Sequence, residues 1–127
     1  MRIFLVRHAH AAPGDPDELR PLTPEGQVAA DEVAERLAAE RPTSVISSPL
    51  LRARQTADKI AEAAGLETEV DERLAPGATS LTLREAVEDR GGTVVAVGHQ
   101  PDCSEIVQKV TGRRVSFAPA HVEELRL

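Results

Sequence analysis

The stretch from Ile3 to His10, IFLVRHAH, decides how this chain folds. Its first four residues are apolar and include β-branched Ile and Val, a composition typical of a strand that is buried in a parallel sheet. An arginine and two histidines follow almost at once. Because open α/β sheets bind their ligands at the carboxyl ends of the strands, the stretch predicts a first strand that delivers charged and titratable groups to a site.

Strand-like and helix-like segments alternate along the rest of the chain. Short strands are expected at residues 44–47 and 66–70, and residues 93–97 (TVVAV) are the clearest buried strand in the chain. The segments between them begin with an N-capping residue or a proline and end with a glycine or a proline, which are helix boundary signals. We expect four helices, which run from Thr23-Pro24 to about Arg41-Pro42, from Ser48-Pro49 to Gly65, from Thr82 to Gly91, and from Pro101 to Gly112.

Two further expectations concern the ends of elements. Thr82 is expected to start the third helix, because Glu85 stands three residues later and would complete a capping box. The segments 115–117 and 122–127 are short and are joined through Pro119. We expect them to form a pair of strands at the edge of the sheet.

The alternation predicts the fold class, which is α/β. A length of 127 residues fits one domain that spans residues 1–127. With no Trp, no Tyr and two Phe, the core must consist mainly of Val, Ile, Leu and Ala, whose small side chains suit helices packed closely on a sheet. We expect a three-layer α/β/α sandwich around a mostly parallel central sheet.

Composition excludes several kinds of partner. The net charge of −6 argues against a nucleic-acid-binding surface, which needs an excess of Lys and Arg. The apolar run at 3–6 is too short for a signal peptide or a membrane span, so we expect no membrane contact. The single Cys103 cannot form an internal disulfide. These features predict a cytoplasmic protein whose partners are proteins or small molecules.

Three segments carry residues that could bind a ligand or take part in catalysis, and each follows a predicted strand. They are Arg7-His8, the run from Ser48 to Arg52 (SPLLR), and Gly98-His99. Because parallel strands end on one edge of a sheet, two His and two Arg that are distant in sequence are expected to share one pocket.

A phosphoryl group is the ligand that fits such a pocket best. Guanidinium groups offer planar forks of permanently charged donors, and neutral imidazoles attack, donate or transfer protons near pH 7. Phosphoryl transfer depends on positioning and on neutralising the charge of three oxygens. Two Arg, a His and the amides of a helix start would supply this without a metal ion or another cofactor.

The three segments also resemble a known family. IFLVRHAH, SSPLLRARQTA and VVAVGHQPD look like the three signatures of the histidine phosphatase superfamily, which includes the cofactor-dependent phosphoglycerate mutases. The short chain and the segment from Arg20 to Gly26 (RPLTPEG) are most similar to its small bacterial branch, the SixA-like phosphohistidine phosphatases. The resemblance covers nearly the whole chain and implies a phosphoglycerate mutase-like fold.

The resemblance implies a role for each site residue. His8 would be the nucleophile that forms a phosphohistidine intermediate, and Arg7 and Arg52 would hold the phosphoryl oxygens. His99 would be the second histidine of the pocket, and Arg20 a further phosphate contact. The implied substrate is a protein phosphohistidine or a small phosphomonoester, hydrolysed without metal.

Two departures from the family pattern bear on activity. Ala9 stands where the family usually has Gly, and its methyl group would crowd the loop if the backbone there needed a positive φ. The candidates for the general acid of the mutase-like branches are Glu72 and Asp102, and neither lies in a matching motif. An imidazole leaving group that already carries a ring proton needs no strong acid, so the gap favours a phosphoramidate substrate. We also find no insertion large enough to form a lid.

Three alternatives remain at the level of sequence. His8-Ala9-His10 has the H-x-H spacing of some metal-dependent hydrolases, although further ligands with convincing spacing are missing. Cys103 near a helix start suggests a cysteine phosphatase, but the C-x5-R motif is absent and we interpret Cys103 as a core thiol. The last alternative is a non-catalytic module that binds phosphate or phosphoproteins in the same pocket.

Overall fold

The sheet has five strands, of which four are parallel and one, at an edge, is antiparallel. The computed structural model describes residues 1–127. The strands are β1 (Arg2–Arg7), β2 (Ser44–Ser47), β3 (Thr68–Val70), β4 (Thr93–Gly98) and β5 (Val122–Arg126). They lie side by side in the order β3-β2-β4-β1-β5, and only β5 is antiparallel to its neighbour.

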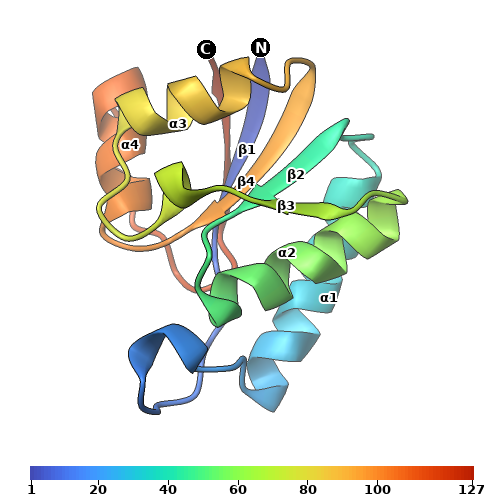
Figure 1. Cartoon of the computed structure of the whole chain (residues 1–127). Coiled ribbons are helices and arrows are strands. Elements are labelled where there is room, and N and C mark those ends of the chain that lie inside the picture. The colour runs from blue at the N-terminus through green and yellow to red at the C-terminus, as the bar shows by residue number, and fades with distance from the viewer.

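Helices cover both faces of this sheet. They are α1 (Pro24–Ala38), α2 (Leu51–Ala64), α3 (Ser80–Glu88) and α4 (Asp102–Thr111), with short 3-10 turns at Asp17–Leu19 (η1) and Glu72–Leu74 (η2). Figure 1 shows α1 and α2 on one face and α3 and α4 on the other. The predicted three-layer α/β/α sandwich with a mostly parallel sheet is confirmed. No helix combines the length and the apolar composition that crossing a lipid bilayer requires.

Alternation along the strands divides the core into two layers. Ile3 and Leu5 of β1 pack with the buried residues of α3 and α4, whereas Phe4 and Val6 pack with those of α1 and α2. This division follows from strand geometry, in which successive side chains point to opposite faces. Strand β1 therefore has to be apolar at four consecutive positions, as the sequence shows.

Several predicted helix ends are confirmed by their hydrogen bonds and dihedral angles. The Thr23 hydroxyl accepts a hydrogen bond from the Gly26 amide at 3.0 Å, and Pro24 occupies the first turn of α1. Gly65 and Gly112 end α2 and α4 with φ of 72° and 76°, left-handed values that only glycine adopts without strain.

Three predicted boundaries are wrong. Helix α3 starts at Ser80, because Thr79 and Thr82 form the capping box and Glu85 takes no part in it. Helix α2 starts at Leu51, after Ser48 has extended the ladder of β2 by donating its amide to the Val97 carbonyl at 3.0 Å. The third strand begins at residue 68, two residues later than predicted.

The predicted pair of edge strands is also wrong. Only the last segment is a strand, and β5 pairs with β1 instead of with residues 115–117. Phe117 is buried in the core on the side of α3 and α4, and its carbonyl accepts a hydrogen bond from the Arg7 guanidinium. Residues 115–117 therefore contribute a buried side chain and a hydrogen bond to Arg7, and they do not pair with a strand.

The register of three parallel strands brings the predicted site together. Val6 of β1 pairs with Val97 of β4, which pairs with Ser47 of β2, so the three strands end level. The ladder extends one residue further, since the His8 amide donates to the Gly98 carbonyl at 3.0 Å. The chain termini lie together at the opposite end of the sheet (Figure 1), where the Met1 amine donates to the Leu127 carbonyl at 2.9 Å.

We expect Gly26→Ala to destabilise the fold. Gly26 is buried in the first turn of α1, and a Cβ there would overlap the His10 carbonyl oxygen. Alanine in a helix usually adds about 0.5–1 kcal/mol of stability relative to glycine, but overpacking costs about 1–3 kcal/mol. We expect a net loss, measured by urea unfolding. Gly14→Ala is the matched control, because its Cβ would lie 3.5 Å from Arg20 Cγ, an ordinary contact. An unfolding midpoint higher in G26A than in wild type would contradict this.

Candidate active site

A pocket of about 320 Å³ lies at the carboxyl edge of the sheet. Eight residues line it: Arg7, His8, Asp17, Arg20, Arg52, Pro76, His99 and Gln100. The structure thus brings together all five of the arginines and histidines singled out from the sequence. Asp17, Pro76 and Gln100 line the pocket as well, and none of them was predicted from the sequence.

His8 is held in one tautomer and one orientation. Its Nδ1 lies 2.7 Å from the Ala9 carbonyl oxygen. Since a carbonyl only accepts hydrogen bonds, Nδ1 carries the ring proton and Nε2 carries the free lone pair. No group of the protein bonds Nε2. The arrangement presents an unprotonated ring nitrogen in a cationic pocket.

His99 lies beside His8 and is hydrogen-bonded to Ser48, the residue that follows β2. The two ring centroids are 5.2 Å apart, with an angle of 58° between the ring planes. His99 Nε2 lies 2.7 Å from the Ser48 hydroxyl, which also accepts the Leu50 amide at 3.2 Å. His99 Nδ1 is buried and has no partner in the protein.

Two arginines reach the pocket from the ends of β1 and the start of α2. Arg7 Nη1 donates to the Phe117 carbonyl at 2.8 Å, and Arg7 Nε is buried without a partner. Arg52 is also buried, in the first turn of α2. Its two terminal nitrogens donate to the carbonyl and the carboxylate of Asp17, at 2.9 and 3.2 Å. Both side chains are therefore fixed before any ligand binds.

Asp17 is the acidic residue of the pocket, and it joins two arginines. Its second carboxylate oxygen accepts from Arg20 Nη1 at 3.0 Å, while Arg20 Nε donates to the Ala12 carbonyl. Hydrogen bonds from Arg20 and Arg52 hold the pKa of Asp17 below its ordinary value of 3.8, so the carboxylate is ionised near pH 7. The D-x-x-R spacing from Asp17 to Arg20, the residue that follows η1, was the signal that could have identified this residue.

Both pocket histidines are neutral near pH 7. Burial lowers the pKa of His8 from 6.5 to about 4, and the positive charges of the nearby arginines add to this effect. Burial also lowers the pKa of His99 to about 4, with His8 and Arg52 contributing. Three guanidinium groups and a single carboxylate leave the pocket with a net positive charge, which suits an oxyanion.

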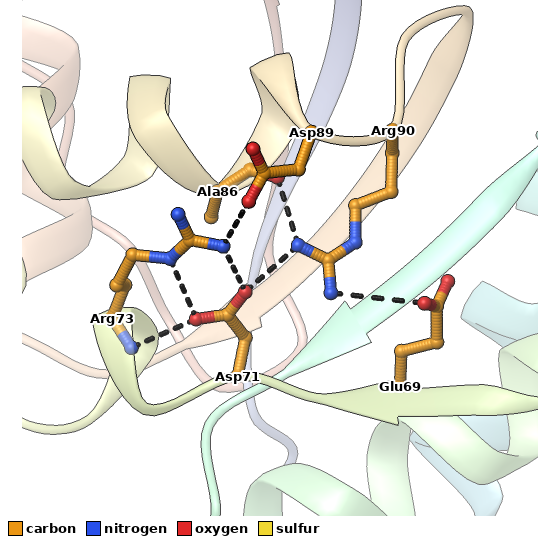
Figure 2. Close-up of polar contacts among 6 residues, drawn as sticks. All are labelled: Glu69, Asp71, Arg73, Ala86, Asp89 and Arg90. Carbon is orange, nitrogen blue, oxygen red and sulfur yellow. Dashed lines mark hydrogen bonds and ion pairs between the residues drawn. The ribbon is translucent and has the colours of Figure 1, made fainter.

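A network of charged residues lies around Asp71, a few residues before Pro76 in the chain (Figure 2). The Asp71 carboxylate follows β3 and accepts hydrogen bonds from Arg73 at 3.0 and 2.8 Å and from Arg90 at 2.8 Å. Arg73 also donates to Asp89 at the end of α3. The hydrogen bonds from Arg73 and Arg90 hold the pKa of Asp71 well below its ordinary value. The network ties the segment before Pro76 to α3.

The two predicted candidates for a general acid do not line the pocket. Glu72 is exposed in η2. Asp102 is buried at the start of α4, where its carboxylate accepts the Gly77 amide at 2.9 Å. Asp102 therefore anchors the loop that carries Pro76, and Asp17 is the carboxylate that faces the pocket.

Ala9 is accommodated without strain. Its backbone does not have a positive φ, a conformation that among non-glycine residues only Arg41 and Ala120 adopt. The methyl group is buried in a small apolar cluster with Leu22, Ala30 and Ala120. The loop after the first strand therefore does not require glycine in this chain.

The structure also bears on the two other chemistries considered from the sequence. Burial raises the pKa of the Cys103 thiol to about 12 and the residue packs in the core, as interpreted. The second histidine of the H-x-H motif, His10, lies 2.9 Å from the Thr23 hydroxyl and does not line the pocket. No three or more His, Cys, Asp or Glu side chains are grouped as a metal site would need.

We expect His8 and His99 to titrate near pH 4 in histidine NMR spectra. Inorganic phosphate is expected to raise both pKa values, because an anion favours the protonated rings. In the unfolded chain the rings titrate near 6.5, so their contribution to the free energy of unfolding is complete above pH 6.5 and is lost as the pH falls toward 4. Midpoints near 6.5 in the folded protein would contradict this electrostatic description.

The chain is similar to proteins of one family. The model of the histidine phosphatase superfamily (branch 1) matches residues 3–76. An uncharacterized protein of Picosynechococcus sp. (strain ATCC 27264 / PCC 7002 / PR-6) is 34% identical over 140 residues, which cover 99% of this chain and 85% of that protein. A probable phosphoglycerate mutase, GpmB, of Yersinia enterocolitica is 37% identical over 79 residues, but these cover 58% of this chain and 37% of the mutase.

Solved structures agree with this assignment. The structure of the protein histidine phosphatase SixA complexed with tungstate matches with a TM-score of 0.87 and 26% identity, covering 100% of this chain and 88% of that one. The putative phosphohistidine phosphatase SixA from Agrobacterium tumefaciens matches with a TM-score of 0.82 and 26% identity, covering 97% and 88%. This chain belongs to the histidine phosphatase superfamily, as a SixA-like enzyme of the phosphatase or mutase type.

Proposed function

We propose that this protein is a metal-independent phosphatase that transfers a phosphoryl group first to His8 and then to water. The observation that supports this most directly is the state of His8, whose Nδ1 proton is held by the Ala9 carbonyl while Nε2 is free. The low pKa of the ring keeps this nitrogen unprotonated at neutral pH. A neutral imidazole nitrogen is the form that attacks phosphorus.

The first step forms one bond and breaks another. His8 Nε2 bonds to phosphorus, and the bond from phosphorus to the leaving atom breaks, with its electron pair going to the leaving group. Arg7 and Arg52 hold the phosphoryl oxygens, and Arg20 adds a third cation at the mouth of the pocket. His99 lies beside the attacking ring and stabilises the charge on the group in transfer. Water then attacks the phosphorylated His8, which releases inorganic phosphate and restores the free ring.

The acid–base groups of the pocket favour a substrate whose leaving group needs little protonation. Asp17 is the carboxylate that faces the pocket, and two arginines hold it in the ionised form. An ionised carboxylate with a low pKa is a poor proton donor to an alkoxide. Phosphohistidine avoids this requirement, because an imidazole that already has a ring proton leaves as a neutral molecule. Similarity to SixA supports the same substrate class.

The size of the pocket is consistent with phosphohistidine carried on a protein. About 320 Å³ is large enough for a phosphoryl group together with the imidazole ring attached to it. The remaining polypeptide would stay at the surface of the enzyme. We therefore propose a phosphorylated protein as the substrate, with small phosphomonoesters as slower alternatives.

The first test is direct detection of the intermediate. Rapid-quench mass spectrometry with an aryl phosphate and a chelator is expected to show an acid-labile phosphoryl adduct on the peptide that contains His8. His8→Gln should abolish the adduct, whereas His10→Gln, a change two residues away on a ring outside the pocket, should retain it. Bound phosphate with neither adduct nor released phenol would identify the chain as a non-catalytic module. Turnover that the chelator abolishes would point to a metal hydrolase.

The second test concerns the leaving group. We expect kcat/KM for a phosphohistidine peptide to exceed that for an alkyl phosphate, because no group in the pocket protonates an alkoxide effectively. The rates should be compared at one pH and with the same enzyme preparation, and an aryl phosphate with a good leaving group serves as the control. Faster turnover of the alkyl phosphate would contradict the proposed substrate class.

A further inference from the structure

The peptide unit between His8 and Ala9 is held on both sides. The Ala120 amide donates a bifurcated hydrogen bond to the Arg7 and His8 carbonyls, at 3.1 and 3.2 Å. The Ala9 amide donates to the Thr56 hydroxyl oxygen at 3.0 Å. Because a peptide unit is planar, two opposed hydrogen bonds fix its rotation, and with it the ψ of His8 and the φ of Ala9.

The Thr56 hydroxyl makes one hydrogen bond as a donor and one as an acceptor, both to backbone groups. Thr56 is completely buried in the second turn of α2. Its hydroxyl donates to the Arg52 carbonyl at 2.9 Å, so the oxygen is left to accept from Ala9. The β-branched side chain has few rotamers in a helix, which keeps the oxygen in place.

Thr56 thus connects the two segments that the proposed reaction depends on. On one side is the loop that carries His8, and on the other is the helical turn that carries Arg52. We propose that Thr56 is a positioning residue, which acts through the Ala9 peptide to aim His8 and to keep its Nδ1 proton on the Ala9 carbonyl. This inference rests on the proposed function, in which His8 is the nucleophile.

Loss of the hydroxyl would act on His8 more than on phosphate binding. Without Thr56 Oγ1, the Ala9 amide would be buried without a hydrogen-bond partner. Rotation of the His8–Ala9 peptide toward another partner would then lower the free energy. Rotation changes the φ of Ala9, and with it the position of the Ala9 carbonyl in the next peptide unit, which lies 2.7 Å from His8 Nδ1. The ring would then populate its other tautomer, in which Nε2 carries the proton and has no lone pair for attack. The Arg52 side chain would remain anchored by Asp17.

Thr56→Val tests this, because it keeps the shape of the side chain and removes the hydroxyl. We expect kcat with an aryl phosphate to fall about 10- to 100-fold, while KM changes by less than about threefold, the signature of a loss confined to the chemical step. Thr56→Ser retains the hydroxyl and should stay within about threefold of wild-type kcat. Equal kcat values for T56V and the wild type would overturn the inference, as would a T56S variant as slow as T56V.

The chain offers a control that repeats this pair of hydrogen bonds at an exposed position. Thr111 lies near the end of α4 that is remote from the pocket, and its hydroxyl makes the same pair of contacts. It donates to the Val107 carbonyl at 2.7 Å and accepts from the Arg113 amide at 3.1 Å. Thr111→Val should therefore leave kcat unchanged. If T111V and T56V lose the same fraction of kcat, a general effect on stability replaces the positioning role.

A spectroscopic readout distinguishes positioning from simple loss of folded protein. Long-range 15N–1H spectra at pH 7 are expected to report the Nδ1–H tautomer of His8 in wild type and T56S, and a tautomer mixture in T56V. An unchanged tautomer in T56V would overturn the inference. If T56V does not fold, T56S and Thr56→Ala form the replacement pair, because they differ in the hydroxyl alone. Absence of turnover in wild type would instead overturn the proposed function.

Discussion

The level ending of strands β1, β4 and β2 is the constraint on which the rest of the site depends. The strands end at the same level because their backbone pairing is continuous across the sheet, with Val6 next to Val97 and Val97 next to Ser47. The ladder then continues into the loops, where the His8 amide reaches Gly98. Parallel pairing requires each strand to be followed by a helix that crosses back over the sheet, so the residues after the strands start at one edge. A pocket drawn from distant parts of the sequence is a consequence of this backbone pattern.

Electrostatics explains why the pocket can hold so many cations. Arg7 and Arg52 are held by backbone carbonyls of Phe117 and Asp17, which are dipoles that accept donors without adding a full negative charge. Asp17 supplies the compensating carboxylate at the mouth. Buried Arg7 Nε and His99 Nδ1 have no partner in the protein. The Arg7 guanidinium is therefore incompletely hydrogen-bonded within the protein, and an anion close to it would offset the cost of burying its charge.

Sequence reasoning identified what depends on local pattern and missed what depends on three-dimensional packing. The strand-end positions of His8, Arg52 and His99 followed from apolar runs and helix starts, because those signals are local. The roles of Thr56 and Asp17 were missed, since a buried threonine in a helix and an acidic loop residue look ordinary in a sequence. The third helix was placed too late because two T-x-x-T/E patterns overlap at Thr79 and Thr82, and the structure uses the earlier one. The Asp71 network joins residues up to 19 positions apart that no periodicity relates.

One hydrogen bond serves both halves of the proposed reaction. While His8 attacks, the Ala9 carbonyl keeps the ring proton on Nδ1 and leaves Nε2 free. After transfer, the phosphorylated ring still has that proton on Nδ1, so His8 leaves phosphorus as a neutral imidazole when water attacks. A substrate phosphohistidine has the same chemical form, a phosphoryl group on one ring nitrogen with a proton available to the other. A pocket that releases the His8 ring from phosphorus without a strong acid is suited to releasing the histidine ring of the substrate in the same way. The absence of a proton-donating acid in the pocket therefore agrees with phosphohistidine as the proposed substrate.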